Sequence, residues 1–269
     1  MRRYCWICIF LCGCLWTNAQ EQKAYELMGE GQYQEAALAF ERALFDSKDI
    51  QERNLFLILK SQCYKALGDY EAGVRNLKRI RFLNSDSLKQ AVDYEPVLLH
   101  YLNHEYQEAY SRIVRIKAKQ TETKETMILS FLVNVDLQKW EEARDLLISQ
   151  DSVFQFDQAD IDYILPPKWK LKNPDKAYNL SLLPGIGQWY AGYFWKGVLS
   201  GSIQLVLGAF SIYSLVEGYF FSGTLTGVAL FYTFYLGGAR YASQLALRKN
   251  HERSEIMKKR FFEKLEEGS

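Results

Sequence analysis

The spacing of apolar residues divides the chain into a first half with helical periodicity and a later part with long uncharged runs. In the first half an aromatic residue recurs at steps of 34 to 37 residues, and Ala or Gly follows each one three positions later. A small residue permits close helix contact, and one helical pair cannot bury its apolar face alone, so the pattern predicts stacked helical pairs. The positions are Tyr33, Ala36 and Phe40; Tyr70 and Gly73; Tyr106 and Ala109; and Trp140 and Ala143.

This pattern resembles the tetratricopeptide repeat, a helix-turn-helix unit of about 34 residues. The resemblance covers roughly residues 20–150, and its best matches begin at Gly31 and Gly68. The third and fourth units depart from it, because they carry His104 and Gln138 where the turn glycine is usual. The resemblance implies an all-α solenoid whose concave surface holds a protein or peptide partner. The alternative is an unspecialised helical bundle with chance spacing.

Residues 151–165 contain several aromatic and branched side chains, and we interpret them as a short helix that closes the last repeat. Pro166 and Pro167 end this helix, because proline lacks an N–H donor and restricts the residue before it. The repeat domain is therefore predicted to span residues 20–165. The basic stretch 166–176 is predicted to be a linker.

Two uncharged runs follow the linker. Residues 197–216 are 20 positions without a charge, residues 218–239 are 22 more, and Glu217 separates them. Each run is long enough to cross a bilayer as a helix, so we predict at least two spans within a membrane domain over residues 177–240. Gly197 with Gly201, and Gly223 with Gly227, are spaced for close helix contact in lipid, although glycine is also simply tolerated in membrane helices.

A glycine- and aromatic-rich motif precedes these runs within Ala177–Trp195. It is similar to a small membrane domain of unknown function that recurs in bacterial envelope proteins, and to two-helix membrane domains with a glycine-rich turn near the membrane surface. The resemblance covers roughly residues 173–240 and implies no known activity. Glycine permits sharp reversals, and the aromatic residues suit a membrane interface. The motif residues are Pro184, Gly185, Gly187, Gln188, Tyr190, Gly192, Lys196 and Gly197.

The first 19 residues have the three parts of a secretory signal peptide: Arg2 and Arg3, an apolar stretch of 13 residues, and a small-residue site ending at Ala19. A permanent anchor and a lipidation signal at Cys14 are the alternatives. Four of the five cysteines lie in this segment, so cleavage leaves Cys63 alone and excludes an intramolecular disulfide framework. We expect a bacterial inner-membrane protein whose repeats face the periplasm.

Charge and candidate chemistry narrow the function classes. The chain has 33 Lys and Arg against 32 Asp and Glu, which argues against a nucleic-acid partner. His100 and His104 would share a helix face near Glu105, but no third ligand is evident, so we predict no metal site and no cofactor. Glu217 is expected in a loop at the membrane surface, and Cys63 is expected to be structural.

Two rules conflict over the predicted topology. A cleaved signal peptide with two spans returns the tail, residues 241–269, to the side of the repeats, yet basic flanking segments prefer the cytoplasm. A third crossing by Ala177–Trp195 resolves the conflict and is the hypothesis we favour; a re-entrant segment with both ends periplasmic is the alternative. Met257, Phe261 and Leu265 then form an apolar stripe that can rest on the inner leaflet.

Two function classes remain. The first is a non-enzymatic, membrane-tethered scaffold of the cell envelope, whose repeats bind an envelope protein or peptide while the C-terminal domain contacts the lipid bilayer. The alternative is a subunit of a membrane transporter or membrane enzyme whose function lies in the C-terminal domain. That alternative needs ionisable residues inside the spans, whereas residues 177–239 contain only Lys196 and Glu217.

Overall fold

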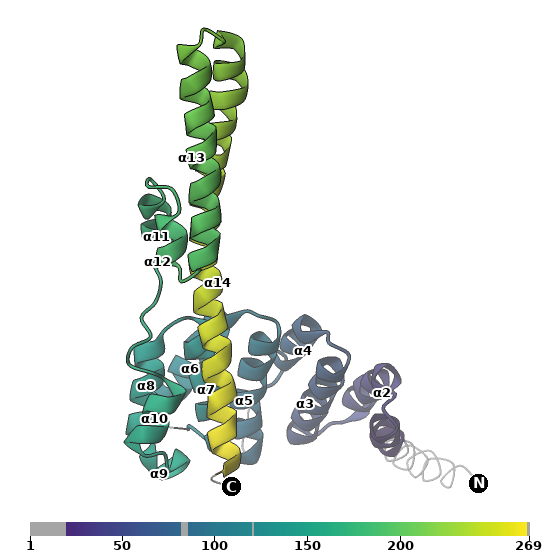
Figure 1. The fold of residues 1–269 in the computed structure, drawn as a ribbon. Helices are drawn as coiled ribbons and strands as arrows, with labels where there is room; N and C mark the ends of the chain where they lie inside the picture. Colours follow the sequence, from purple (N-terminus) through teal and green to yellow (C-terminus); the bar gives the residue numbers. More distant parts are fainter. Residues whose placement is uncertain (1–19, 82–85, 120, 268–269) are drawn as a thin grey trace, which may run out of the picture. The chain divides into compact units, whose positions relative to one another are not determined.

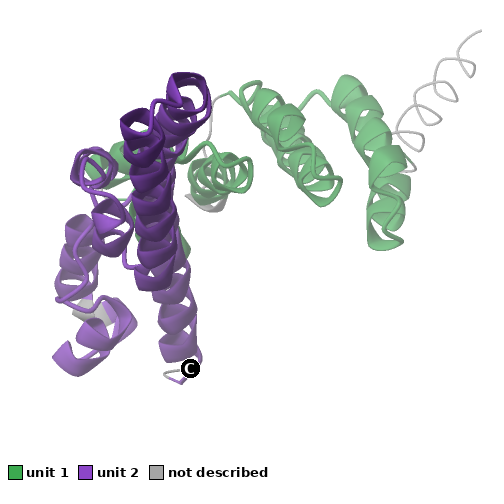
Figure 2. Cartoon of the chain, turned by 45° about the horizontal axis from the view of Figure 1, so that its top comes forward, with its two compact units in different colours: residues 1–137 green, residues 138–269 purple. Residues whose placement is uncertain are grey.

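The computed structural model describes residues 20–81, 86–119 and 121–267, and all regular secondary structure in these ranges is helical (Figure 1). This confirms the predicted all-α class. The predicted signal peptide lies outside the described residues. The chain forms two compact units, residues 1–137 and residues 138–269 (Figure 2). The boundary falls inside the fourth predicted repeat and not after residue 165.

The first unit is a series of consecutive antiparallel helices. It begins with the helical residues 20–29, and each later helix packs on the next one along the chain. Contacts also join α3 to α5 and α5 to α7. The helices are α2 (Tyr33–Asp46), α3 (Ile50–Ala66), α4 (Tyr70–Leu77), α5 (Asp86–Leu102), α6 (Tyr106–Lys119) and α7 (Lys124–Asp136).

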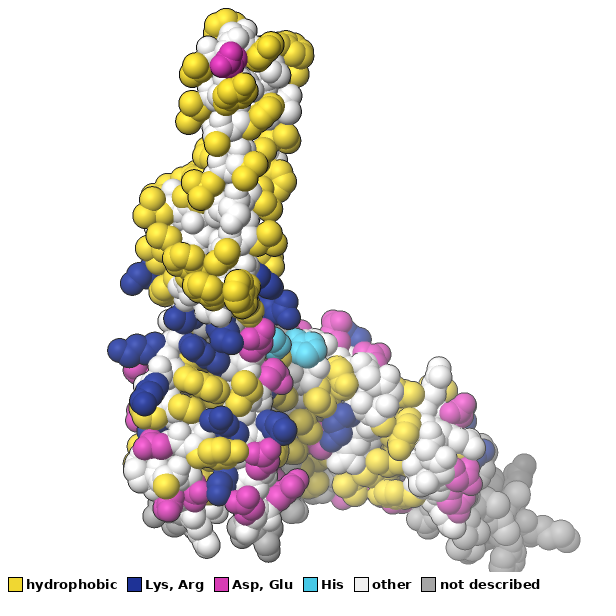
Figure 3. Space-filling view, in the orientation of Figure 1, with side chains coloured by type: hydrophobic (Ala, Val, Ile, Leu, Met, Phe, Trp, Pro, Cys, Tyr) yellow, Lys and Arg dark blue, Asp and Glu magenta, His cyan; other side chains and the backbone are white. Residues whose placement is uncertain are grey.

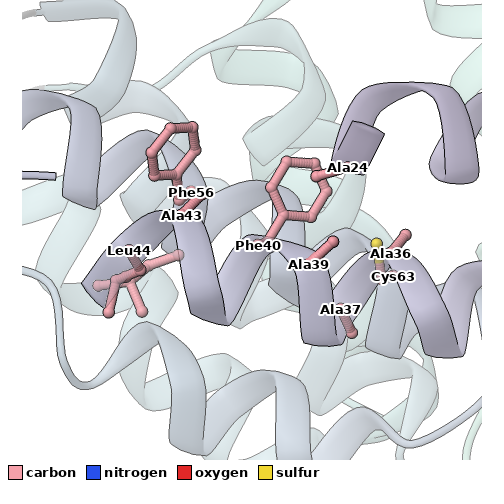
Figure 4. Close-up of a cluster of buried hydrophobic side chains, with 10 residues drawn as sticks. Ala24, Ala36, Ala37, Ala39, Phe40, Ala43, Leu44, Phe56 and Cys63 are labelled. Carbon is pink, nitrogen blue, oxygen red and sulfur yellow. The ribbon is translucent and has the colours of Figure 1, made fainter. Parts of the chain in front are cut away.

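The first core cluster shows why these helices pair. Figure 4 shows Phe40 of α2 among small residues of its own helix, with Phe56 and Cys63 contributed by α3. Phe40 is fully buried, and its ring centroid lies 6.1 Å from that of Phe56 and 5.6 Å from that of Tyr25. Apolar burial of this kind is the main stabilising contribution to a helical pair.

The four expected turn positions share one backbone conformation. Gly31 and Gly68 have φ of 78° and 75°, and His104 and Gln138 have φ of 59° and 60°. At the first three turns, the N–H of the next residue donates to the carbonyl five positions earlier, as in a Schellman motif: Gln32 to Leu27, Asp69 to Tyr64 and Glu105 to His100. The turn is therefore kept even where glycine is replaced.

The predicted small residues lie at the closest helix contacts. Ala36, Ala109 and Ala143 are fully buried, and a Cβ added to Gly73 would lie 3.0 Å from a Leu99 methyl carbon. The aromatic residue at the start of each unit is partly buried at the first three positions, and Trp140 is buried.

The second unit begins with three short helices and ends with a long one. α8 (Trp140–Ser149), α9 (Asp151–Phe154) and α10 (Gln158–Ile164) precede the two prolines. The predicted closing helix is thus two short helices. The remaining elements are α11 (Pro174–Leu180), α12 (Ile186–Tyr190), α13 (Phe194–Val216), the π-helix η1 (Ser222–Val228) and α14 (Ala229–Glu267).

The predicted linker is held against α14. The backbone N–H of Lys172 donates to Asn250 Oδ1 at 2.8 Å, and Asn250 Nδ2 donates to the Lys172 carbonyl at 2.9 Å. Asn250 is buried, and Arg253 donates to the Lys170 carbonyl at 2.6 Å. Because both backbone groups of Lys172 are satisfied by one buried amide, this stretch has a defined path along the helix.

Two of the three residues of the tail's apolar stripe are buried inside the second unit and Leu265 is half-buried, which corrects the expectation that the stripe rests on the inner leaflet. Met257 and Phe261 are buried within the second unit, and the Phe261 ring centroid lies 5.7 Å from that of Phe154 and 6.0 Å from that of Phe156. The stripe is buried because α14 continues without a break past residue 240, so the tail packs on the segment before the prolines.

The segment Ala177–Trp195 departs from the three-span hypothesis. It forms α11 and α12, of seven and five residues, joined by turns. Helices of these lengths rise about 10 Å and 8 Å, well short of the roughly 30 Å of a bilayer core. Pro184 and two glycines with positive φ, Gly185 and Gly192, interrupt the helix.

A matched pair of glycine substitutions tests the turn conformation. A Cβ added at Gly68 or Gly29 would meet nothing within 4 Å, but only Gly68 has positive φ. Gly68→Ala should lower the free energy of unfolding by about 1 kcal/mol, because L-residues are disfavoured there. Gly29→Ala should be neutral or stabilise the helix by up to about 1 kcal/mol. Urea unfolding of the full chain in mild detergent, followed by circular dichroism, measures both. Equal effects would contradict the proposed turn.

Candidate functional site

α13, η1 and the start of α14 form a helical hairpin. The predicted motif residues come together at its base, in a glycine-rich corner formed by residues 177–197. Gly185 has φ of 88° and caps the start of α12, and a Cβ added there would collide with the carbonyl of Gly197. A Cβ at Gly197 would collide with the ring of Trp189. These two glycines are therefore required for the start of α13 to lie against the turn before α12.

Gly187 fixes a second close contact of the corner. A Cβ added to Gly187 would collide with Ser181 Oγ and with the carbonyl of Ala177, and would lie 3.0 Å from the Ala242 methyl. Ala177 and Ala242 are fully buried and belong to one apolar cluster. At this contact, Gly187 of α12 lies between Ala177 of α11 and Ala242 of α14, so the three helices approach one another closely.

A buried amide cluster joins the corner to both helices of the hairpin. Gln188 is 1% exposed, and its Nε2 donates to the Gly238 carbonyl at 3.0 Å and to Ser200 Oγ at 3.3 Å. Gln204 Nε2 donates to the same Ser200 hydroxyl at 3.2 Å. The Oε1 atoms of Gln188 and Gln204 are buried without a hydrogen-bond partner among the described residues.

The hairpin of α13, η1 and the start of α14 buries a row of polar side chains and exposes many large apolar ones, although Ser202 and three threonines are also exposed. Gln204, Ser211 and Ser214 of α13 are buried. Figure 3 shows yellow apolar side chains along the whole column, interspersed with white atoms, and dark-blue Lys and Arg side chains around its base. The most exposed apolar side chains are Trp195, Leu205, Val206, Val216, Phe220 and Phe221.

The spaced glycines of this region are packing positions. A Cβ added to Gly201 would lie 3.2 Å from the Pro184 carbonyl oxygen, and one added to Gly223 would lie 2.9 Å from Leu215. At Gly227 a Cβ would lie 2.9 Å from both Cα and Cβ of Ser211. Of the two interpretations left open by the sequence, close helix contact therefore fits the geometry.

Tyrosines and cations surround the open side of the corner. The Tyr190 hydroxyl accepts a hydrogen bond from the Asn173 N–H at 3.0 Å, and Lys172 Nζ lies 4.8 Å from the Tyr190 ring centroid. Tyr193 donates to Glu252 Oε1 at 2.7 Å. Burial, and then this bond, raise the pKa of Tyr193 to about 12, while the same bond lowers the pKa of Glu252.

Lys196, the one cation of the motif, is half-buried at the start of α13. Its Nζ lies 4.7 Å from the Tyr193 ring centroid and 5.5 Å from that of Tyr241. Gly192, the last glycine of the motif, has φ of 93° and lies nearest to the Lys249 side chain. Glu217 caps the C-terminus of α13 in the turn at the tip of the hairpin.

The other titratable candidates are dispersed. His100 Nδ1 lies 2.6 Å from Glu105 Oε2, whereas His104 lies in the left-handed turn and its Nδ1 is 2.9 Å from the Tyr106 hydroxyl. The two histidines do not share a helix face, because α5 ends at Leu102. In the described part of the chain, no group of three or more His, Cys, Asp or Glu side chains is arranged to hold a metal ion.

Cys63 is buried in the first unit, and burial raises the pKa of its thiol to about 11. The thiol is therefore protonated near neutral pH and is a poor nucleophile.

Sequence reasoning missed Ser200, Gln204 and Gly238 of the amide cluster. A signal for the first two was present, because polar residues 200, 204, 211 and 214 recur every three to seven positions on a mostly apolar helix. Gly238 had no such signal, since its contribution is a backbone carbonyl.

One helix in the described ranges, α13, is long and apolar enough to cross a membrane. Its 23 residues rise about 35 Å. The second uncharged run does not form one α-helix of that length, because it is divided between η1 and α14, which continues into charged sequence.

A second matched pair tests the corner. Gly197 and Gly237 are both helical, but a Cβ would meet Trp189 at Gly197 and nothing within 4 Å at Gly237. Gly197→Ala should cost roughly 1–3 kcal/mol through overpacking, and Gly237→Ala should be neutral or slightly stabilising. Thermal unfolding in detergent, followed by tryptophan fluorescence, reports on both. An unchanged melting temperature for Gly197→Ala would refute the observed contact.

Comparison with models of known protein families, with curated proteins and with solved structures found no match to this chain.

Proposed function

We propose that the protein is a non-enzymatic scaffold of the bacterial cell envelope, anchored in the inner membrane by its C-terminal hairpin. Its helical pairs form a tetratricopeptide-like solenoid that binds a protein or peptide partner in the periplasm. The observation that carries the anchoring proposal is the reversed polarity of the hairpin: buried Gln204, Ser211 and Ser214 and an apolar outer surface. Such a surface is costly in water and suited to lipid.

Aromatic side chains at both ends of the hairpin support a crossing orientation. At its base, Trp189, Phe194 and Trp195 are exposed, and the rings of Trp189 and Phe194 stack with centroids 5.4 Å apart. At the tip, Tyr219 and Phe220 are exposed beside the turn that contains Glu217. Aromatic residues favour the two membrane interfaces, and the helix between these belts matches the bilayer core in length.

The contacts of α14 favour two crossings over three. Its C-terminal turns bond to the segment that precedes the hairpin: Arg260 donates to the Tyr163 carbonyl at 2.7 Å, and Lys264 Nζ lies 3.0 Å from Asp160 Oδ1. Segments in direct contact lie on one side of a membrane, so the chain crosses an even number of times between them. The tail is then periplasmic together with the repeats, if the signal peptide is removed.

The repeat proposal rests on the shared geometry of the pairs. Left-handed turns, fully buried small residues and contacts from α3 to α5 to α7 recur at the spacing of the sequence pattern. The first unit also has a groove of about 490 Å³, lined by Leu38, Lys23 and Arg42 among others. Leu38 is 60% exposed there, which suits an apolar side chain of a partner.

Cysteine accessibility tests the topology. In a background with all five cysteines replaced, Glu30→Cys, Lys259→Cys and Glu217→Cys are labelled in intact cells with a membrane-impermeant maleimide. We expect labelling at residues 30 and 259, and labelling at residue 217 only after the inner membrane is permeabilised. Labelling at only one of residues 30 and 259 would place them on different sides of the membrane and would refute the two-span hairpin. Labelling at residue 217 alone would keep the hairpin and refute export of the repeats.

Photo-cross-linking in cells tests partner binding by the full chain. A photoreactive phenylalanine analogue replaces Leu38 in the groove or, as a control, Glu71, whose side chain is 73% exposed on α4 and does not line the groove. We expect a light-dependent adduct with one envelope protein from position 38 that is absent from position 71. Identical adducts from both positions, or none from position 38, would contradict binding at this groove.

A further inference from the structure

A groove runs between α13 and α14 on the outside of the hairpin. Its volume is about 590 Å³. Lys196 and Tyr241 line one end of the groove, and Ile203 and Phe234, with Thr233 beside them, line the other. Residues 196 and 203 are about 10 Å apart along the helix axis. The groove therefore has a charged end near the corner and an apolar end toward the tip.

The charged end lacks a matching anion. No carboxylate forms an ion pair with Lys196 within the described ranges, and the tyrosine rings beside it supply only a weak cation–π contact. Glu252, the acidic group of this region, is already engaged by Tyr193, Arg248 and Lys249. A half-buried, uncompensated cation at this position favours an anionic ligand.

The apolar end points to a lipid as the source of that anion. Leu199 is 63% exposed and Phe234 is 47% exposed along the groove. A soluble phosphate would gain nothing from these walls, whereas an acyl chain would cover them. The Ser200 hydroxyl lines the groove between the two ends.

From this groove we infer a binding site for one anionic phospholipid, with the headgroup phosphate at Lys196 and Tyr241 and one acyl chain along Leu199, Ile203 and Phe234. The inference rests on the proposed membrane anchoring. It adds a specific lipid contact at the corner, which would fix the depth of the hairpin at the interface.

The test uses the full chain purified in neutral detergent and native mass spectrometry with phosphatidylglycerol or phosphatidylcholine of the same acyl chains. Wild type should retain one phosphatidylglycerol in preference to phosphatidylcholine. Lys196→Gln should weaken this binding about fivefold, the loss expected for one cation near a headgroup. Arg240→Gln is the matched control, because Arg240 is exposed beside Tyr241 and does not line the groove. It should change binding less than twofold.

Gly237→Leu tests the acyl-chain end without touching a charge. Gly237 lines the groove, and an added Cβ meets nothing within 4 Å, so the leucine should fill the groove without disturbing the helices. Binding of phosphatidylglycerol should fall, and glycerol phosphate without acyl chains should not bind. Circular dichroism of each variant verifies folding.

Three results would overturn the inference: equal binding of the two lipids, equal losses from Lys196→Gln and Arg240→Gln, or undiminished binding by Gly237→Leu. Extraction of the protein from cell membranes by alkaline carbonate separates this failure from failure of the proposed anchoring. A protein that stays in the membrane but shows no lipid preference refutes the lipid site alone.

Discussion

The continuity of α14 is the constraint on which the second unit depends. Its 39 residues rise about 58 Å, so one helix forms part of the hairpin and also packs on the segment before the prolines. Near its start, the Gly238 carbonyl accepts from Gln188, and near its end Phe261 is buried against Phe154. In the proposed membrane orientation, contacts at both ends of this single helix would set the depth of the hairpin and the side of the tail together.

This continuity also accounts for the basic tail, which conflicted with the charge rule for topology. Arg253 donates to the Lys170 carbonyl and lies 5.6 Å from the Trp169 ring centroid, and Arg260 lies 4.6 Å from that of Tyr163. These cations are bound to backbone carbonyls and aromatic faces of the folded unit. The charge rule counts Lys and Arg close to the ends of the spans. We propose that packing contacts outweigh it here, because these two arginines are already used inside the folded unit.

Predictions from the sequence agree with the structure at positions where a single physical requirement, such as close helix contact, decides which residue type is allowed. The all-α class, the turn positions and the buried small residues followed from spacing, because a close helix contact excludes a large side chain whatever lies elsewhere. The apolar stripe that includes Met257 and Phe261 was also predicted, but the prediction that lipid covers it was wrong, because Phe154 and Phe156 pack against Phe261. An apolar stripe shows that something covers it and does not say whether that is lipid or Phe156.

The sequence predicted which residues form the corner, but it did not predict how they are arranged in space. Pro184 and the glycines indicated a reversal, yet the division into two short helices depends on Gly185 lying against Gly197, a contact between residues 12 positions apart. The amide cluster could not be predicted from the sequence for the same reason. Gln188 and Gln204 were visible as polar residues in apolar sequence, but the Gly238 carbonyl that anchors Gln188 lies on α14, 50 residues from it.

Close helix contacts at small residues contribute to stability in different ways in the two units. In the first unit, Gly73 brings α4 onto Leu99 of α5, and the gain is apolar area removed from water. In the hairpin, Gly227 lies against Ser211, and lipid would supply no comparable hydrophobic drive between helices. Close approach there gains van der Waals contact, and at Gly238 it brings a backbone carbonyl within reach of Gln188. Small residues thus pack an apolar core in the first unit and a partly polar core in the hairpin, which is the difference expected if the hairpin lies in lipid as proposed.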